Sequence, residues 1–339
     1  MSLLLREHVS LKPYNTFALE GAARWFAEAR TDAEVDEAIA LARALGVPLL
    51  PLGGGSNLLL TGDVPALVLR MGSRGTRRVA EQGPQVIVEA EAGEPWHPFV
   101  SGCLASGLYG LENLSLIPGT VGAAPIQNIG AYGVEIKDRF AGLDALDLHT
   151  GERRSFDAPA CAFGYRDSRF KRELGRWLIL RVRFALRRTP EVTLDYGPIR
   201  QRLAEEGITR PRPEDVSRVI CALRTEKLPD PAVLPNAGSF FKNPVVTGDQ
   251  ARALASRCPD LVAYSQADGR SKLAAGWLIE RAGWKGFREG DAGVHGSQAL
   301  VLVNHGQATG EQVMSLAKRI QADVSERFGV VLEMEPVLL

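Results

Sequence analysis

Residues 117–133 read Ile117-Pro118-Gly119-Thr120-Val121-Gly122-Ala123-Ala124-Pro125-Ile126-Gln127-Asn128-Ile129-Gly130-Ala131-Tyr132-Gly133. The stretch holds four glycines, three alanines and two prolines, and it carries no charged side chain. Glycine lets the main chain approach a bound group closely, and convergent main-chain N–H groups can bind an anion without a cation. We therefore expect this stretch to lie against a large, partly apolar ligand that carries phosphates. A buried Gly/Ala crossover packed against a sheet is the alternative.

A second glycine cluster, Gly53-Gly54-Gly55-Ser56-Asn57, lies about sixty residues upstream. It follows a helix that is predicted to begin with a capping box at Thr31–Glu34 and to end at Gly46. The apolar segment Val47–Leu52 then predicts a strand that runs into the loop. The cluster matches neither GxGxxG nor a P-loop. Two separated glycine loops can hold the two ends of one diphosphate, although a solvent-exposed hinge would have the same composition.

Hydrophobic periodicity predicts a mixture of helices and short strands over the rest of the chain. The predicted helices span residues 94–107, 214–225, 272–282 and 311–328, and the predicted strands span 66–71, 86–92, 145–149, 153–156, 177–186, 299–304 and 330–335. The proline-rich segment Lys227–Pro231 resembles a domain boundary. These patterns predict an α+β protein of two or three domains.

Composition excludes several classes of protein. The chain has 339 residues, 45% of them hydrophobic, and 40 basic residues balance 40 acidic residues. A neutral net charge provides no field that would attract nucleic acid or an anionic membrane. No apolar run reaches the roughly 18 residues of a membrane-spanning helix, and the N-terminus lacks the features of a signal peptide. We therefore expect a cytoplasmic protein without nucleic-acid or membrane partners.

The cysteines and histidines are scattered. The four cysteines, Cys103, Cys161, Cys221 and Cys258, show no CxxC spacing, and the five histidines show no metal-ligand spacing. We expect free thiols in a reducing compartment and no metal site.

The segment Asn236-Ala237-Gly238-Ser239-Phe240-Phe241-Lys242-Asn243-Pro244 places a hydroxyl, an ammonium and two amides around two aromatic rings. A turn before a strand, with Ser239 bonded to main chain, would explain it structurally. A serine hydrolase fits poorly because the chain has no GxSxG elbow. Without a base, Ser239 is a poor nucleophile but a workable proton relay in a closed site.

Two further segments carry ionisable side chains that could take part in catalysis. Arg166, in the turn Phe163–Ser168, offers a planar donor fork, or it pairs with its neighbour Asp167. Glu333 and Glu335 alternate along the predicted last strand and would face the same side. Burial would raise the pKa of such a carboxyl enough for it to act as an acid, whereas two surface glutamates on an edge strand are the structural alternative.

Taken in order, the segments Pro51–Asn57, Ile117–Gly133 and Asn236–Pro244 resemble those of the UDP-N-acetylenolpyruvoylglucosamine reductases, a family of flavoenzymes, and of its longer, type I members in particular. The resemblance extends from about Tyr14 to Glu335. It implies an FAD-binding domain of the PCMH/vanillyl-alcohol-oxidase type in two subdomains and a smaller C-terminal α+β substrate domain. The expected ranges are 1–67, 68–226 and 227–328, with the last strand, in 329–339, returning to the first subdomain.

The resemblance also implies a reaction and its residues. NADPH would reduce a non-covalently bound FAD, and the enolpyruvyl group of a UDP-sugar would then receive hydride at its β-carbon. Ser239 resembles the proton donor to the α-carbon. Arg166 and Glu335 resemble the pair that polarises the substrate carboxylate, with Glu333 as the alternative to Glu335. Tyr196, Lys227 and Asn243 match positions that contact the nucleotide sugar.

The expected flavin contacts come from the two glycine-rich stretches. They are Leu52, Gly53, Gly54, Gly55, Ser56, Asn57, Ile117, Pro118, Gly119, Thr120, Val121, Gly122, Ala123, Gln127, Asn128, Gly130, Ala131, Tyr132 and Gly133.

Two other functions fit parts of this pattern. An FAD oxidase of the same fold would consume oxygen with a small alcohol and ignore NADPH. A non-catalytic nucleotide-sugar-binding protein would be colourless. The neutral charge and the absence of a coiled-coil pattern favour a monomer.

Overall fold

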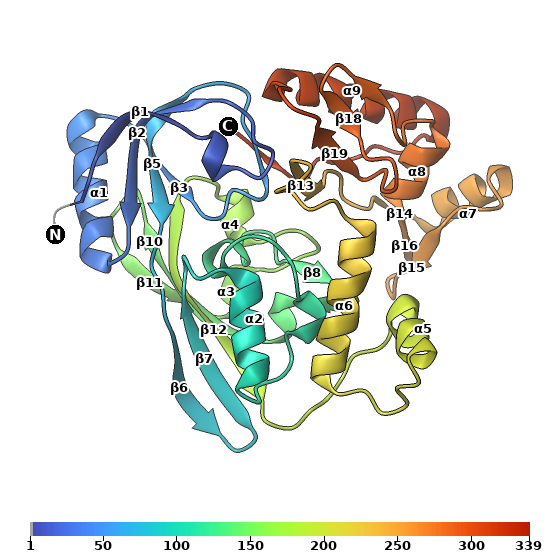
Figure 1. Cartoon of the computed structure of the whole chain (residues 1–339), viewed down its shortest axis with the longest axis horizontal. Helices are drawn as coiled ribbons and strands as arrows, with labels where there is room; N and C mark the ends of the chain where they lie inside the picture. The colour runs from blue at the N-terminus through green and yellow to red at the C-terminus, as the bar shows by residue number, and fades with distance from the viewer. Residues whose placement is uncertain (1–2) are drawn as a thin grey trace. The chain divides into compact units, whose positions relative to one another are not determined.

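The capping box predicted at Thr31 begins helix α1 (Asp32–Leu45) in the computed structural model, which describes residues 3–339. The Thr31 side chain accepts a hydrogen bond from Glu34 N, and the Glu34 carboxylate accepts one from Thr31 N at 3.1 Å. Gly46 ends the helix in the left-handed region with φ of 65°, a conformation that favours glycine. Helix α1 packs on strand β2 (Ala22–Ala29), as Figure 1 shows.

Strand β2 belongs to a four-stranded sheet of order β1-β2-β5-β3. Its other strands are β1 (Arg6–Ser10), β5 (Val64–Met71) and β3 (Leu49–Leu52). Strands β2 and β3 both pair in parallel with β5. The glycine cluster Gly53–Asn57 therefore begins at the carboxyl end of β3, where the chain leaves the sheet.

A second, five-stranded sheet is antiparallel throughout, with the order β11-β10-β12-β7-β6. Its strands are β11 (Arg153–Phe156), β10 (Phe140–Asp147), β12 (Trp177–Arg187), β7 (Gln85–Glu91) and β6 (Thr76–Gln82). Helix α2 (Trp96–Ala105) shares its core and buries the predicted stripe of Trp96, Phe99, Val100, Cys103 and Leu104. The Trp96 and Phe184 rings meet edge to face, with centroids 5.7 Å apart.

Shorter elements complete this part of the chain. They are the hairpin β8 (Gly130–Ala131) and β9 (Val134–Glu135), the helices α3 (Ala158–Cys161), α4 (Arg169–Arg172), α5 (Gly197–Glu205) and α6 (Pro213–Lys227), and the 3-10 turns at Glu112–Leu114, Val121–Ala123 and Ile136–Asp138. Helices α5 and α6 enclose a small core of their own around Ile199 and Val216.

The chain divides into two compact units. The first unit comprises the chain up to Val9, Ala22–Gly55 and Val64–Arg224, and the second comprises Ser10–Gly21, Ser56–Asp63 and Thr225–Leu339. The α+β class is confirmed. The predicted boundary at 67/68 falls inside β5, and the division into three domains stays a prediction.

The second unit contains three further sheets. One has the order β13-β19-β18-β17, one has the order β14-β16-β15, and one pairs β20 in parallel with β4. Their strands are β13 (Asn236–Ser239), β19 (Val301–Asn304), β18 (Ala292–Val294), β17 (Arg288–Glu289), β14 (Val245–Thr247), β16 (Arg270–Leu273), β15 (Ala263–Ser265), β20 (Val337–Leu338) and β4 (Leu58–Leu59). The helices are α7 (Gly248–Arg257), α8 (Ala275–Arg281) and α9 (Gly310–Phe328), with a 3-10 turn at Lys12–Tyr14. Helix α9 packs against β18 and α8 (Figure 1).

Three sequence predictions were wrong in detail. Strand β6 was missed because nearly all of its residues are exposed, so its sequence does not alternate. The helix predicted over 272–282 begins only at Ala275, because Lys272 and Leu273 belong to β16 and Asn243 Oδ1 accepts a hydrogen bond from Ala275 N at 2.9 Å. The strand predicted over 330–335 is reduced to an isolated bridge between Met334 and Phe241.

Candidate active site

The two glycine-rich stretches meet within the first unit. A Cβ atom built on Gly54 would lie 2.9 Å from Gly119 Cα, and one built on Gly53 would lie 2.8 Å from Thr120 Oγ1. Such distances are shorter than real side chains tolerate, and position 54 requires glycine because the Gly119 atoms that it meets belong to main chain. The expectation that two separated loops come together is met, because their main chains are in direct contact.

The stretch Ile117–Gly133 is hydrogen-bonded to the segment that connects strand β7 to helix α2. Val121 N donates to Glu94 O and Gly122 N donates to Ala92 O, each at 2.8 Å. Trp96 N donates to Gly119 O at 3.0 Å. The amides of Val121 and Gly122 are therefore committed to the fold, and they cannot serve as the phosphate-binding N–H groups that the sequence pattern suggested.

Other amides of the two stretches remain available. Within residues 3–339, the N–H groups of Gly53, Gly54, Gly55, Gly119 and Thr120 donate no hydrogen bond. The hydroxyl of Thr120 is buried and also lacks a partner in the described chain. A buried hydroxyl without a hydrogen bond is costly. A diphosphate accepts hydrogen bonds from such groups, so these residues fit FAD.

The remaining predicted flavin residues differ in exposure. Leu52 and Val121 are buried, Gly54, Pro118 and Gly133 are exposed, and Ile117, Ala123, Gln127, Gly130, Ala131 and Tyr132 are half-buried. In the second unit, Asn57 donates from Nδ2 to Glu335 O at 3.1 Å, and half-buried Ser56 precedes it.

Tyr132 and Gly133 form the two-residue turn between β8 and β9. Both have positive φ, 52° and 84°, as a type I′ hairpin turn requires. The Tyr132 ring packs edge to face on Tyr196, with centroids 5.1 Å apart, so the structure joins a predicted flavin residue to a predicted substrate residue. Burial raises the pKa of the Tyr132 hydroxyl.

Arg224 belongs to the same cluster and was not predicted. Its Nε donates to Leu116 O at 3.2 Å, and burial lowers the pKa of its guanidinium, which interacts with Tyr132. A cation on the otherwise apolar side of helix α6 was the signal in the sequence that could have identified it.

Arg166 lies in a tight turn closed by a hydrogen bond from Gly164 N to Asp167 O at 2.9 Å. Its Nη2 donates to Gly130 O at 2.5 Å, while the Asp167 carboxylate pairs with Arg172. The structure therefore joins Arg166 to the glycine-rich stretch and gives Asp167 another partner.

Asn128 was expected to touch the flavin, and its side chain is hydrogen-bonded within the protein. The residue is 0% exposed. Its Nδ2 donates to Glu135 Oε2 at 2.9 Å and to Gly164 O at 3.0 Å, and its Oδ1 accepts from Lys137 N at 3.2 Å. Both amide protons are thus donated within the protein.

In the second unit, a buried asparagine shapes the segment that carries Ser239. Asn236 Oδ1 accepts from Gly238 N at 2.8 Å, and its Nδ2 donates to Leu234 O at 2.8 Å. Gly238 adopts a φ of 71°, and Ser239 then lies exposed immediately before the buried Phe240. Ser239 is exposed, and its hydroxyl makes no hydrogen bond within the described residues. The alternative in which Ser239 bonds to main chain is therefore wrong.

Glu335 and Glu333 have different environments. Glu335 N donates to Phe240 O at 2.9 Å, which places the residue beside the Ser239 segment, and Glu335 is only 8% exposed. Glu333 is exposed and pairs with Lys242. Because only Glu335 is buried, the structure favours it over Glu333.

Two predicted substrate residues also lie in the second unit. Asn243 is half-buried, and Lys227 is exposed at the last position of α6. Lys227 forms no ion pair among residues 3–339. Arg166 and Tyr196 belong to the first unit.

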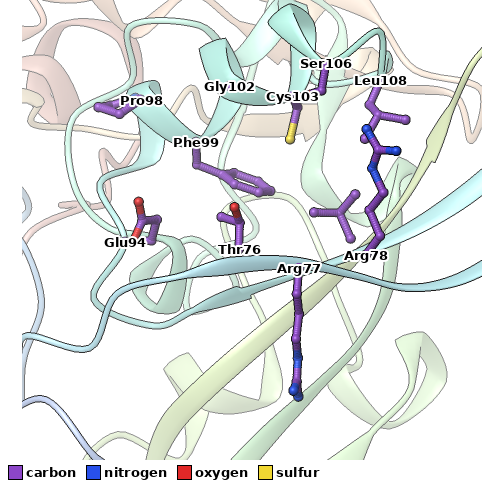
Figure 2. A pocket seen from close by; sticks show the side chains of 11 residues that line it. Thr76, Arg77, Arg78, Glu94, Pro98, Phe99, Gly102, Cys103, Ser106 and Leu108 are labelled. Carbon is purple, nitrogen blue, oxygen red and sulfur yellow. The ribbon is translucent and has the colours of Figure 1, made fainter.

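A cavity of about 300 Å³ lies elsewhere, between strand β6 and helix α2. Figure 2 shows Phe99 and Cys103 of α2 facing Thr76 of β6 across it. No predicted site residue lines this cavity, so we do not assign the reaction to it. Among residues 3–339, no cluster of His, Cys, Asp or Glu could hold a metal ion, and no helix is long and apolar enough to span a membrane.

Comparisons with known proteins agree on one family. The model of an FAD binding domain matches residues 23–157, and that of the UDP-N-acetylenolpyruvoylglucosamine reductase C-terminal domain matches residues 230–339. The UDP-N-acetylenolpyruvoylglucosamine reductase of Pseudomonas fluorescens is 67% identical over 336 residues, covering 99% of each chain. That of Pseudomonas aeruginosa is also 67% identical, over all of both chains.

A solved structure has the same fold. The crystal structure of the UDP-N-acetylenolpyruvylglucosamine reductase (MurB) from Thermus caldophilus matches with a TM-score of 0.65 and 26% identity, covering 100% of this chain and 99% of that one. The expected FAD-binding domain with a C-terminal reductase domain is confirmed.

Proposed function

Because the chain belongs to the UDP-N-acetylenolpyruvoylglucosamine reductase family, we propose that it reduces the enolpyruvyl group of UDP-N-acetylglucosamine enolpyruvate to give UDP-N-acetylmuramate. This reaction supplies a precursor of peptidoglycan. The enzyme is an oxidoreductase that uses FAD and NADPH. The observation that carries the proposal is the 67% identity over essentially the full length of curated reductases.

The two glycine-rich stretches hold the FAD. The contact between Gly54 and Gly119 brings the unpaired amides and the Thr120 hydroxyl of these loops together, and such groups bind a diphosphate without an added cation. When bound, the flavin supplies hydride transfer from NADPH to the substrate. No histidine or cysteine occurs in either stretch, in keeping with non-covalent binding.

Ser239 donates the proton to the substrate α-carbon. Its hydroxyl is exposed and makes no hydrogen bond within residues 3–339, so it can be offered to a ligand. Its neighbours Phe240 and Phe241 are almost completely buried, which fixes the main chain from which the hydroxyl projects. A positioned hydroxyl near a reacting carbon can transfer a proton without acting as a nucleophile.

Arg166 and Glu335 polarise the substrate carboxylate. A guanidinium binds a carboxylate through paired, charge-assisted hydrogen bonds. Glu335 is buried beside the segment that carries Ser239, where its carboxyl group can stabilise charge that develops on the substrate. Tyr196, Lys227 and Asn243 contact the nucleotide diphosphate and sugar, with Lys227 supplying the cation.

We further propose that the enzyme is a cytoplasmic monomer. Support comes from its neutral net charge and from a sequence without coiled-coil periodicity.

Separate measurement of the two half-reactions tests the proposal. In the Ser239→Ala variant, NADPH should bleach the flavin at the wild-type rate, because the serine takes no part in that step. Reoxidation by the enolpyruvyl sugar should be abolished. Wild-type turnover of Ser239→Ala would show that the assigned role is wrong, while a wild-type protein that NADPH does not bleach would overturn the proposed reaction.

A further inference from the structure

The turn that carries Arg166 is attached to the glycine-rich stretch by three hydrogen bonds from side chains to main chain. Asn128 Nδ2 donates to Gly164 O at 3.0 Å, Arg166 Nη2 donates to Gly130 O at 2.5 Å, and Ser168 Oγ donates to Ile126 O at 2.6 Å. The bonded residues are 36 to 42 positions apart in sequence. These bonds fix the position of residues 163–168 relative to residues 126–130.

Asn128 occupies the centre of this attachment. It is fully buried, and its φ of 46° lies in the left-handed region, which asparagine tolerates better than most residues. The same amide that reaches Gly164 also donates to Glu135 Oε2, and that carboxylate pairs with Lys137 Nζ at 2.7 Å. Asn128 therefore joins the loop, the hairpin strand β9 and the arginine turn.

The arginine turn needs such support from outside. Arg166 itself adopts a φ of 52°, a conformation that costs a residue with a large side chain roughly 1–2 kcal/mol. Residues in strained conformations persist only where surrounding structure holds them. Asn128 donates to the carbonyl of Gly164, which lies two residues before Arg166 in the same hydrogen-bonded turn. This bond therefore helps to fix the direction in which the Arg166 guanidinium points.

We propose that Asn128 is a positioning residue for Arg166, which fixes the arginine turn against the glycine-rich loop without touching substrate or flavin itself. The inference rests on the proposed role of Arg166 toward the substrate carboxylate. A misplacement of about 1 Å in such a group can cost a reaction about a hundredfold. Loss of the Asn128 amide should therefore slow the step that uses Arg166 and spare the step that does not.

Asn128→Gly is the most direct variant, because glycine keeps the left-handed backbone and removes only the side chain. We expect the variant to retain FAD and to be reduced by NADPH within about twofold of the wild-type rate, whereas reoxidation by the enolpyruvyl sugar should slow by about 10- to 100-fold. Asn128→Ser keeps a small polar side chain that is too short to bond both Glu135 and Gly164, and it adds no buried charge beside the Glu135 carboxylate. It should slow reoxidation in the same way, and it serves if the glycine variant does not fold.

A double-variant cycle separates positioning from a general structural role. Arg166→Lys alone should slow reoxidation, and adding Asn128→Gly to it should slow that step no further, because residues that act through one another are not additive. Asn304→Gly is the matched control. Asn304 is another fully buried asparagine, and its Nδ2 donates to Phe17 O at 3.1 Å. Its loss should lower stability but leave the rates of both half-reactions at their wild-type values.

Three results would overturn the inference. Loss of FAD or equal slowing of both half-reactions in Asn128→Gly would mean that Asn128 supports the flavin loop. Additive effects in the double variant would mean that Asn128 acts independently of Arg166. If instead Arg166→Lys reoxidises at the wild-type rate, the proposed role of Arg166 fails, and this outcome is recognisable without any Asn128 variant.

Discussion

Gly54 and Gly119, which are separated by 64 intervening residues, lie so close that a Cβ atom on Gly54 would come within 2.9 Å of Gly119 Cα and 3.3 Å of Gly119 C. Both of these Gly119 atoms belong to main chain, so an added Cβ could be accommodated only if the backbone of one loop moved. The contact brings two loops that each present unpaired amides into one site.

Gly54→Ala should separate the two loops. Overpacking of this kind typically costs about 1–3 kcal/mol of stability. We expect FAD affinity, measured by fluorescence titration of the apoprotein, to fall at least about tenfold, which corresponds to about 1.4 kcal/mol. Gly102→Ala is the control, because a Cβ there meets nothing within 4 Å and the position is helical. Unchanged FAD affinity in Gly54→Ala would contradict the two-loop site.

Thr120→Val tests the buried hydroxyl that has no partner. Because the hydroxyl is unpaired in the described chain, its replacement by a methyl group should leave the stability of the apoprotein unchanged or raise it by about 1 kcal/mol. FAD binding should weaken by about tenfold, since the ligand loses a donor. Thr120→Ser retains the donor and should bind FAD normally. Equal FAD affinity in Thr120→Val and wild type would exclude this contact.

Glu335→Gln and Glu333→Gln should behave differently. Removing a positioned acid typically costs about 10²- to 10⁴-fold, so Glu335→Gln should slow flavin reoxidation by at least about a hundredfold while reduction by NADPH is unaffected. Glu333 is exposed, and surface ion pairs such as the one with Lys242 contribute only about 0–1 kcal/mol. Glu333→Gln should keep its rate within about twofold. The opposite ranking in stopped-flow measurements would assign the role to Glu333.

Cys103 and Cys161 should resist thiol reagents in the folded protein. Burial raises the pKa of each thiol from 9.0 to about 12, and only the thiolate reacts. Above about pH 9 the unfolded thiols ionise while the folded ones stay protonated, so stability should fall as the pH rises from about 9 toward 12. Cys103→Ala should reduce that slope in urea titrations. Labelling of all four cysteines at equal rates near neutral pH would contradict the buried state.

Local signals in the sequence predicted much of the fold. The capping box at Thr31 and the buried stripe of α2 were found because a helix end and a helix face each depend on residues close in sequence. Strand β6 was missed because it is paired on one edge only and exposed along most of its length, so its residues carry no alternation. Its strand state depends on pairing with β7.

The site was predicted less completely than the fold. The composition of the glycine-rich stretches indicated close main-chain approach, which the Gly54–Gly119 contact shows. Composition does not reveal which main-chain amides donate hydrogen bonds within the protein. The amides of Val121 and Gly122 do so, to the carbonyl oxygens of Glu94 and Ala92. Asn128 was grouped with the flavin contacts because it lies in the same stretch, yet its left-handed backbone turns its side chain toward Gly164. Long-range bonds of this kind have no local signature.

The visible spectrum of the purified protein tests the central claim, that bare main chain from two distant loops holds a redox-active flavin. We expect flavin absorbance in the fresh protein or after FAD is added back, complete bleaching by NADPH under anaerobic conditions, and recovery of the colour when UDP-N-acetylglucosamine enolpyruvate is added. A protein that shows no flavin absorbance either as purified or after incubation with FAD would contradict the account.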